Sequence, residues 1–178
     1  YEKCPMGDVG TEFVYMPKSD GSHYVDGFLN YEGEEVATVK GTYKSEGNGY
    51  LDAEVGMEKL PLHFVNGFVP DQIMGLKGYG EGKLSLKGAL SQLDVEGEVY
   101  LDSAYLVSVP DGITMRFAND PVRIIDSKLL FENFMMYANN ESPLNIQGSL
   151  DFTNIEKMML DIRMRAQNFL LIDAKENA

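Results

Sequence analysis

The chain has 178 residues, a formal net charge of -13 and 44% hydrophobic residues. A length of this order suits one domain, which we expect to span residues 1–178. The excess of acidic residues argues against nucleic acid and against docking on anionic lipid surfaces, because both are bound by clustered Lys and Arg. Cys4 is the single cysteine, so we expect neither a disulfide framework nor a thiolate metal site. No apolar run approaches the roughly 20 residues of a membrane-spanning helix.

Short runs in which apolar and polar residues alternate fill the first third of the chain. A period of two predicts strands that have one apolar and one polar face. Turns rich in Gly and Pro separate these runs. The predicted strands are 11–16, 23–31, 34–43 and 48–57.

The period then changes to four. Leu60, Phe64 and Phe68 recur at four-residue steps, the spacing of one helical face. Pro61 suits the first turn of a helix, where its missing N–H is not needed. We therefore predict a short helical insertion near residues 58–76, with these three apolar residues covering the apolar side of the sheet.

Residues 78–102 predict a central hairpin. Gly88 and Gly97 lie inside its strands, where glycine costs stability unless a bend or close approach requires it. We therefore expect a curved hairpin with its apolar side concave. The apolar face should carry Leu84, Leu86, Leu93, Val95, Val99 and Leu101. The polar face should carry Lys83, Ser85, Lys87, Asp94, Glu96 and Glu98.

The same alternation continues to the C-terminal region, except that residues 129–137 are apolar on both faces, which predicts burial on two sides. The further predicted strands are 103–109, 113–118, 122–125, 128–137, 144–152, 158–167 and 168–173. Their apolar positions include Leu144, Ile146, Leu150, Leu160, Ile162 and Met164. Roughly a dozen short strands at this spacing predict an all-β (mainly β) protein.

No pattern typical of catalysis is found. His23 and His63 are the only histidines, and no nucleophile motif frames a serine. Gly78, Gly80 and Gly82 precede a strand, whereas a phosphate-binding loop leads into a helix N-terminus. We therefore expect a protein that is not an enzyme and that uses no metal or cofactor.

Strands with one apolar face must cover it, and the chain offers only one short helix. Two packed sheets, or one sheet closed on itself, would bury these faces within the chain. An open trough would instead leave a groove that requires an apolar guest. The residues alone leave these three architectures open.

The order of the strand motifs narrows the choice. Residues 82–88 read Gly-x-Leu-x-Leu-x-Gly, and after a short turn residues 93–102 contain Val-x-Gly-x-Val-x-Leu. This arrangement resembles the TamB-like translocation and assembly module family, a group of AsmA-like envelope proteins. The resemblance is strongest to the family members found in Bacteroidetes. The resemblance continues in 120–131, 143–148 and 161–168. It covers about residues 50–174 and is weaker in 1–45.

The resemblance implies a long antiparallel sheet folded into an open trough (a "β-taco") with a hydrophobic interior. It implies a periplasmic protein of a Gram-negative bacterium, anchored in the inner membrane, of which this chain is one segment. It implies a role in outer membrane biogenesis, through phospholipid transport between the membranes or through assembly of outer-membrane proteins and autotransporters (protein secretion). The full-length protein is expected to work with an outer-membrane insertase of the Omp85 type.

On this interpretation the partners are phospholipid acyl chains or apolar polypeptide, with no nucleic acid and no membrane span in this segment. The alternative is a chaperone-like, peptide-binding module that captures unfolded outer-membrane strands by β-augmentation. The expected groove lining is Leu84, Leu86, Val95, Val99, Leu101, Leu144, Ile146, Leu150, Leu160, Ile162 and Met164, covered by Leu60, Phe64 and Phe68.

Overall fold

The computed structural model describes residues 7–47, 49–68, 74–108, 113–118, 120–154 and 157–171. These residues form eleven strands and one short 3₁₀ helix, so the predicted all-β class is confirmed. The elements are β1 (Val9–Pro17), β2 (Ser22–Tyr31), β3 (Glu34–Lys44), β4 (Tyr50–Pro61), η1 (Leu62–Phe68), β5 (Met74–Ala89), β6 (Gln92–Ser108), β7 (Thr114–Phe117), β8 (Val122–Ile125), β9 (Lys128–Tyr137), β10 (Leu144–Asp151) and β11 (Met159–Ala166).

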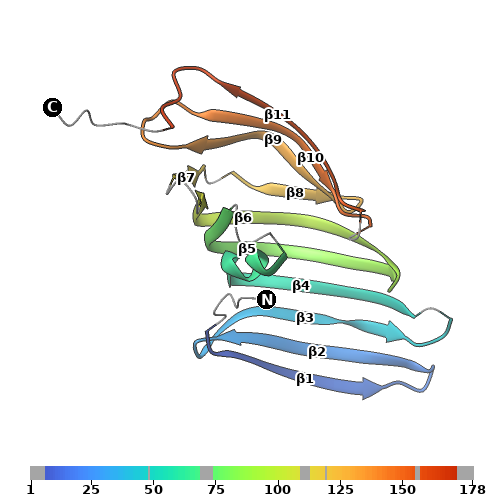
Figure 1. Ribbon diagram of the computed structural model, residues 1–178. Helices are drawn as coiled ribbons and strands as arrows, with labels where there is room; N and C mark the ends of the chain where they lie inside the picture. The colour runs from blue at the N-terminus through green and yellow to red at the C-terminus, as the bar shows by residue number, and fades with distance from the viewer. Residues whose placement is uncertain are drawn as a thin grey trace.

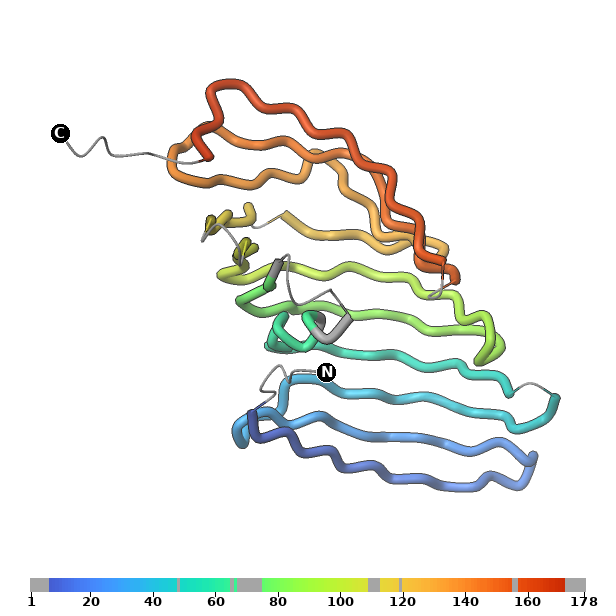
Figure 2. Tube along the Cα trace, viewed as in Figure 1, coloured from blue at the N-terminus to red at the C-terminus, as the bar shows by residue number. Residues whose placement is uncertain are grey.

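All described strands belong to one antiparallel sheet, in which sequence neighbours are mostly spatial neighbours. The order runs from β1 to β7 and then through β9, β10 and β11, while β8 pairs with β6 and β9. Figures 1 and 2 show the strands as successive rungs from the blue β1 to the red β11. Because the strands form one sheet, the described part of the chain is not a sandwich of two packed sheets.

The register of the central hairpin separates its apolar and polar residues. Leu86 pairs with Val95, and Lys87 pairs with Asp94. Residues that pair directly across an antiparallel ladder lie on the same face. The strands therefore have the two-faced pattern that the sequence predicts, with Val95 half-buried and Glu96 exposed.

Two glycines in this hairpin occupy positions that no other residue fits. Gly82 and Gly97 have φ values of 149° and 151°, a region that L side chains rarely adopt. A Cβ atom at Gly97 would collide with the carbonyl oxygen of Lys83, and one at Gly82 with that of Glu98. The two backbones can approach this closely only because both residues lack a side chain.

The helix is shorter than predicted, because residues 58–61 continue β4 and residues 74–76 begin β5. Leu60 was expected on the helix but lies in β4, where it pairs with Gly80. A β-bulge between Met57 and Leu60 adds one residue to β4. The bulge brings both residues to the same face, which produces a three-residue apolar step inside a strand. The predicted helical position of Leu60 is therefore wrong.

η1 is fastened to the sheet by one asparagine. The side-chain amide of Asn66 donates to the carbonyl oxygen of Leu76 at 3.1 Å, and its carbonyl oxygen accepts from the Leu76 N–H at 2.7 Å. The Phe64 ring lies edge-on to Tyr31 of β2, with centroids 5.5 Å apart. η1 therefore lies against the sheet in front of β4 and β5 (Figure 1).

The predicted strand at 168–173 is not formed in its described part, residues 168–171. Side-chain amides replace strand pairing there. Asn140 donates to the carbonyl oxygen of Asn168 at 2.7 Å, and Asn139 donates to that of Leu171 at 2.8 Å. These bonds hold the segment beside the β9–β10 loop without a ladder.

One cluster of buried residues packs together in the C-terminal half of the sheet, and Val36, Ala37, Ala53 and Met57 are also buried in β3 and β4. Val122, Phe134, Met136 and Ile146 are buried together, and half-buried side chains from β6 to β11 pack around them. The accessible surface of the chain is 12187 Å². A compact protein of 19.9 kDa would expose only about 8,700 Å². An excess of roughly 40% is expected of a chain whose described strands form a single sheet without a second sheet packed on it.

Candidate apolar binding face

The strand register identifies one face that continues across the sheet. Starting from Leu86, the pairs lead through Ala53 of β4 and Gly41 of β3 to Val25 of β2. In the other direction, Val99 pairs with Val122 of β8. The pairs Ile124–Leu129, Leu129–Leu150 and Leu150–Leu160 then extend the face to β11. We call this surface the apolar face.

All eleven expected lining residues lie on the apolar face, but their exposure differs. Ile146 is buried, with 6% of its surface exposed. Leu160 and Met164 on the edge strand β11 are 63% and 64% exposed. The half-buried ones are Leu84, Leu86, Val95, Val99, Leu101, Leu144, Leu150 and Ile162. The face is thus closed near β9 and β10 and open at the β11 edge.

Of the three residues expected to cover this face, two can be placed. Leu60 is half-buried in β4, and Phe64 is half-buried in η1 against Tyr31. The side chain of Phe68 lies outside the described part of the structure. The described side chains of η1 therefore lie over the part of the face near Tyr31 and the neighbouring ends of β4 and β5.

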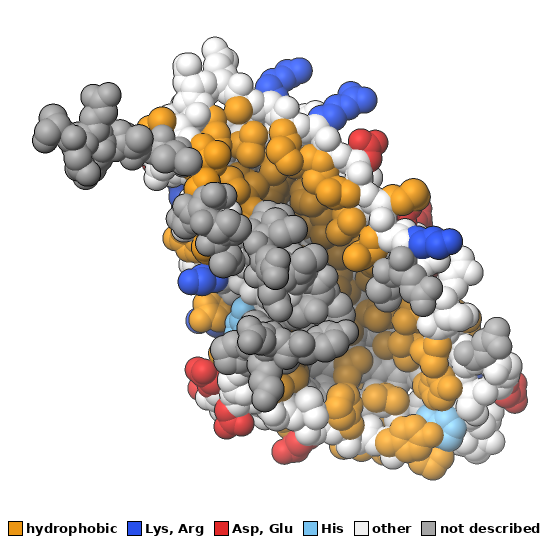
Figure 3. Space-filling model, viewed as in Figure 1, with side chains coloured by type: hydrophobic (Ala, Val, Ile, Leu, Met, Phe, Trp, Pro, Cys, Tyr) orange, Lys and Arg blue, Asp and Glu red, His pale blue; other side chains and the backbone are white. Residues whose placement is uncertain are grey.

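The space-filling view shows hydrophobic side chains at the surface on two parts of the apolar face. Hydrophobic side chains gather over β9–β11 and again over the first strands, while charged side chains lie along the rim (Figure 3). At the β1 edge, Phe13 and Tyr15 are 61% and 58% exposed. Monomeric soluble proteins rarely leave large contiguous apolar areas exposed unless these areas bind something.

One hollow on this face is lined by two of the expected groove-lining residues and by two apolar residues outside that set. Leu86 and Val95 line it together with Leu93 and Phe152. Phe152 follows β10, and its N–H donates to the carbonyl oxygen of Ser127 at 3.0 Å. The sequence signal for Phe152 was its place in the alternation of 144–152, but its approach to the hairpin depends on the long-range fold.

A second group that sequence reasoning missed is an aromatic stack near the β1 edge. His23 stacks on Tyr15 at 4.8 Å and lies 6.4 Å from Tyr43, measured between ring centroids. The three residues come from β1, β2 and β3. His23 pairs directly with Tyr43, and Tyr15 pairs with Val25, which lies two residues along β2 on the same face as His23. They add aromatic surface to the apolar face at a point where the expected lining has no member.

The opposite face is polar and charged. Exposed ion pairs join its strands, including Lys83–Glu54 at 3.7 Å and Arg123–Glu132 at 3.3 Å. Such exposed pairs contribute little to stability because water screens them. The charged face therefore keeps one side of the sheet in water and leaves the apolar face as the candidate binding surface.

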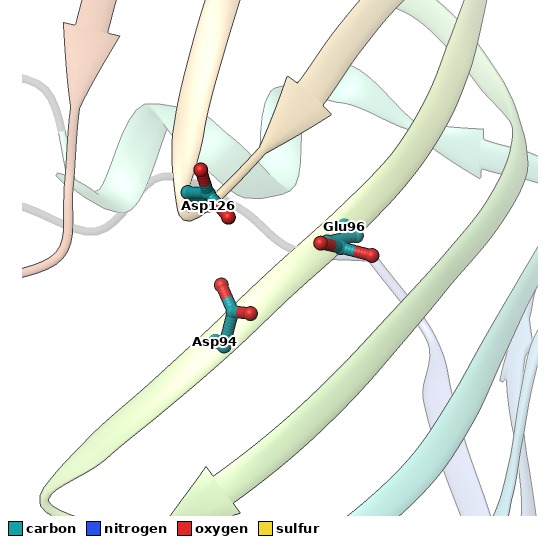
Figure 4. Close-up of side chains that lie close together, drawn as sticks. All are labelled: Asp94, Glu96 and Asp126. Carbon is teal, nitrogen blue, oxygen red and sulfur yellow. The ribbon is translucent and has the colours of Figure 1, made fainter.

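Three carboxylates gather on the charged side. Asp94 and Glu96 project from β6 and Asp126 from the turn after β8 (Figure 4), and their oxygen atoms lie within 4.8 Å of one another. All three are exposed. Exposed acidic groups are common on protein surfaces without a bound ion, so this cluster is assigned no metal.

No family model matches the chain, and neither a curated protein nor a solved structure matches it. The TamB-like resemblance in the strand motifs therefore stays a prediction. Among the residues that the structure describes, no helix has the length and hydrophobicity needed to cross a membrane.

Proposed function

We propose that this chain is a non-enzymatic segment of a TamB-like periplasmic protein, and that its apolar face holds phospholipid acyl chains. The observation that carries the proposal is the continuous apolar face itself. It runs from β1 to β11 by direct strand pairing, and side chains such as Leu160 and Met164 remain exposed on it. In this proposal the sheet serves as an open trough for an apolar guest.

The chemistry of the face suits a lipid tail. Acyl chains leave water for the same reason that core side chains do. Each buried methylene contributes about 0.8 kcal/mol, so a long chain can be held without a specific polar ligand. A face lined by Leu, Ile, Val and Met offers this contact along many strands and lets a chain move from one position to the next.

The biological role proposed for this segment is outer membrane biogenesis in a Gram-negative bacterium. Phospholipid passage between inner and outer membrane requires a route that shields acyl chains from water. In the proposal the full-length protein is anchored in the inner membrane and works with an Omp85-type insertase. This segment supplies part of the shielded route.

Site-specific photo-crosslinking in cells tests the proposal. A photo-reactive residue at Leu86, Val99 or Leu160 should capture phospholipid, because these side chains lie on the apolar face and are not fully buried. The matched controls are Lys87 and Glu98, each next in sequence to one of the probed residues and on the polar face. Equal capture at both sets, or none at the apolar positions, would contradict the proposal.

A second candidate function rests on the sheet edges. Every residue of β1 is exposed, and the outer side of β1 pairs with no strand in the described part of the chain. An extended peptide could add to such an edge through main-chain hydrogen bonds. Mass spectrometry after gentle purification distinguishes the two functions: co-purified lipid supports the acyl-chain route, and a co-purified outer-membrane peptide supports strand capture.

A further inference from the structure

Two arginines stand together on the edge strand β11. Arg163 pairs with Gln147 and Arg165 with Asn145 of β10, so both arginines lie on the polar face. Both are exposed. They are the only cationic pair with alternate spacing on an edge strand of the described residues, in a chain whose net charge is -13.

These arginines differ from the other arginines of the described sheet in having no acidic partner. Arg116 lies 3.6 Å from Glu141, and Arg123 lies 3.3 Å from Glu132. Within the described residues, no carboxylate oxygen lies within 4.0 Å of the guanidinium of Arg163 or Arg165. Their charge is therefore available to an anion from outside the chain.

The other side of the same strand is apolar and equally open. Leu160 and Met164 are exposed large hydrophobic residues on that side of β11. A surface hollow is lined by Arg163, Met164 and Arg165 with Asn145 and Gln147. The β11 edge thus presents cationic groups and exposed apolar surface within one strand, which is the complement of an anionic amphiphile.

We propose that Arg163 and Arg165 bind the phosphate of a phospholipid whose acyl chains lie on the apolar face beside Leu160 and Met164. This inference rests on the proposed function and adds the place where the headgroup is held and the residues that hold it. The planar guanidinium group donates two parallel N–H bonds to phosphate oxygens, a geometry that lysine cannot provide. In this arrangement the lipid lies across the β11 edge that the described residues leave unpaired, with its headgroup on the charged side and its tails on the apolar side.

A phospholipid fits this edge better than other anions do. Free phosphate would meet two exposed arginines in water, where salt screens their attraction, and would leave the apolar side unused. Nucleic acid needs a longer cationic surface, and the remaining surface is acidic. Of these ligands, only an amphiphile can contact both the arginines on the polar side of β11 and the apolar residues on its other side.

Binding of short-chain lipids to the protein tests the inference. The probes are dihexanoyl phosphatidylglycerol and uncharged dihexanoylglycerol, each below its micelle concentration, with inorganic phosphate as a third ligand. The double variant Arg163→Gln/Arg165→Gln should bind phosphatidylglycerol about tenfold more weakly than the wild type, equivalent to about 1.4 kcal/mol. Its affinity for dihexanoylglycerol should not change.

A matched control removes the same charge elsewhere on the polar face. Lys83→Gln/Lys87→Gln alters two alternate residues of β5, inside the sheet, and should leave phosphatidylglycerol binding within about twofold of the wild type. An equal loss in both double variants would show a general charge effect and overturn the inference.

The remaining outcomes separate the inference from the proposed function. If the wild type binds both lipids equally and the arginine variant is unchanged, the acyl-chain function stands and the headgroup site is wrong. If the wild type binds neither lipid, the proposed function fails, and the inference fails with it. Phosphate that binds as tightly as phosphatidylglycerol would also overturn the inference, because the apolar side would then contribute nothing.

Discussion

The hydroxyl of Ser127 accepts a hydrogen bond from the backbone N–H of Val95 at 3.0 Å and donates one to the carbonyl oxygen of Leu93 at 3.1 Å. Ser127 lies in the turn between β8 and β9, and β8 pairs with β6 only at residues 97–99. The buried Ser127 side chain therefore continues the ladder where the strand pairing ends, and it fixes β6 at the expected lining residue Val95.

Replacing this hydroxyl should destabilise the protein. Ser127→Ala leaves the Val95 N–H and the Leu93 carbonyl without these partners, at an expected cost of about 1–3 kcal/mol in the free energy of unfolding. Ser85→Ala on β5, where the hydroxyl makes no described hydrogen bond, should cost less than about 0.5 kcal/mol. Urea denaturation of both variants checks the difference, and equal values would contradict the role given to Ser127.

Gly97 tests the close approach of β5 and β6. Gly97→Ala places a methyl group against the carbonyl oxygen of Lys83 at a φ of 151°, so we expect a loss of about 2–4 kcal/mol. Gly10→Ala is the control, because the nearest atom to its new methyl group lies 3.8 Å away. Its cost should stay below about 0.5 kcal/mol. A tolerated Gly97→Ala would show that the hairpin does not need this contact.

A substitution at Phe64 tests how much the packing of η1 on the sheet contributes to stability. The ring is half-buried against Tyr31 and His63, so Phe64→Ala should cost about 1–3 kcal/mol, less than the loss of a fully buried ring. Tyr100→Ala on the polar face removes an exposed ring and should cost under about 1 kcal/mol. Thermal unfolding compares the two variants, and a smaller effect at Phe64 than at Tyr100 would mean that η1 is not packed on the sheet.

Asp20 offers a test by titration. The Ser22 hydroxyl donates to Asp20 Oδ1 at 2.6 Å, and this bond holds the pKa of Asp20 below its ordinary value of 3.8. A lowered folded-state pKa means that the bond stabilises the turn above pH 3.8 and is lost as the pH falls through the lowered value. Ser22→Ala should therefore raise the pKa of Asp20, as measured by NMR. The pKa of Asp151, lowered by Thr153 in another turn, should not move.

Local alternation was enough to predict most strands. Residues 122–125 and 128–137 form strands with the predicted bounds, because a short turn between two runs of strand-forming residues specifies a local hairpin. Pairing of Leu86 with Val95 likewise follows from the two-residue turn between β5 and β6. The two-faced character of the sheet was therefore available from the sequence.

Features that depend on bulges or on contacts between distant residues could not be predicted from local alternation. Leu60 fits the spacing of apolar residues on one face of a helix. A bulge in β4 also places apolar residues three positions apart on one face, so the pattern did not require a helix. Ser103, with a φ of 49°, lets β6 run through a position where the sequence suggested a new strand. Arg163 and Arg165 could be placed on a polar face, but their lack of acidic partners depends on strands that the sequence does not place beside them.

The central claim is that the apolar face is an open binding surface rather than a closed core. The direct measurement is the affinity of the purified protein for a long-chain fluorescent fatty acid, in the wild type, Val99→Arg and Tyr100→Arg. Val99→Arg should remain folded, because a long side chain on an open face can extend its charge to water. It should bind the probe at least about tenfold more weakly, since the charge opposes burial of the acyl chain. Tyr100→Arg, next in sequence but on the polar face, should bind like the wild type. If the wild type binds no fatty acid, or if Val99→Arg unfolds the protein, then the face is a closed core and the central claim is wrong.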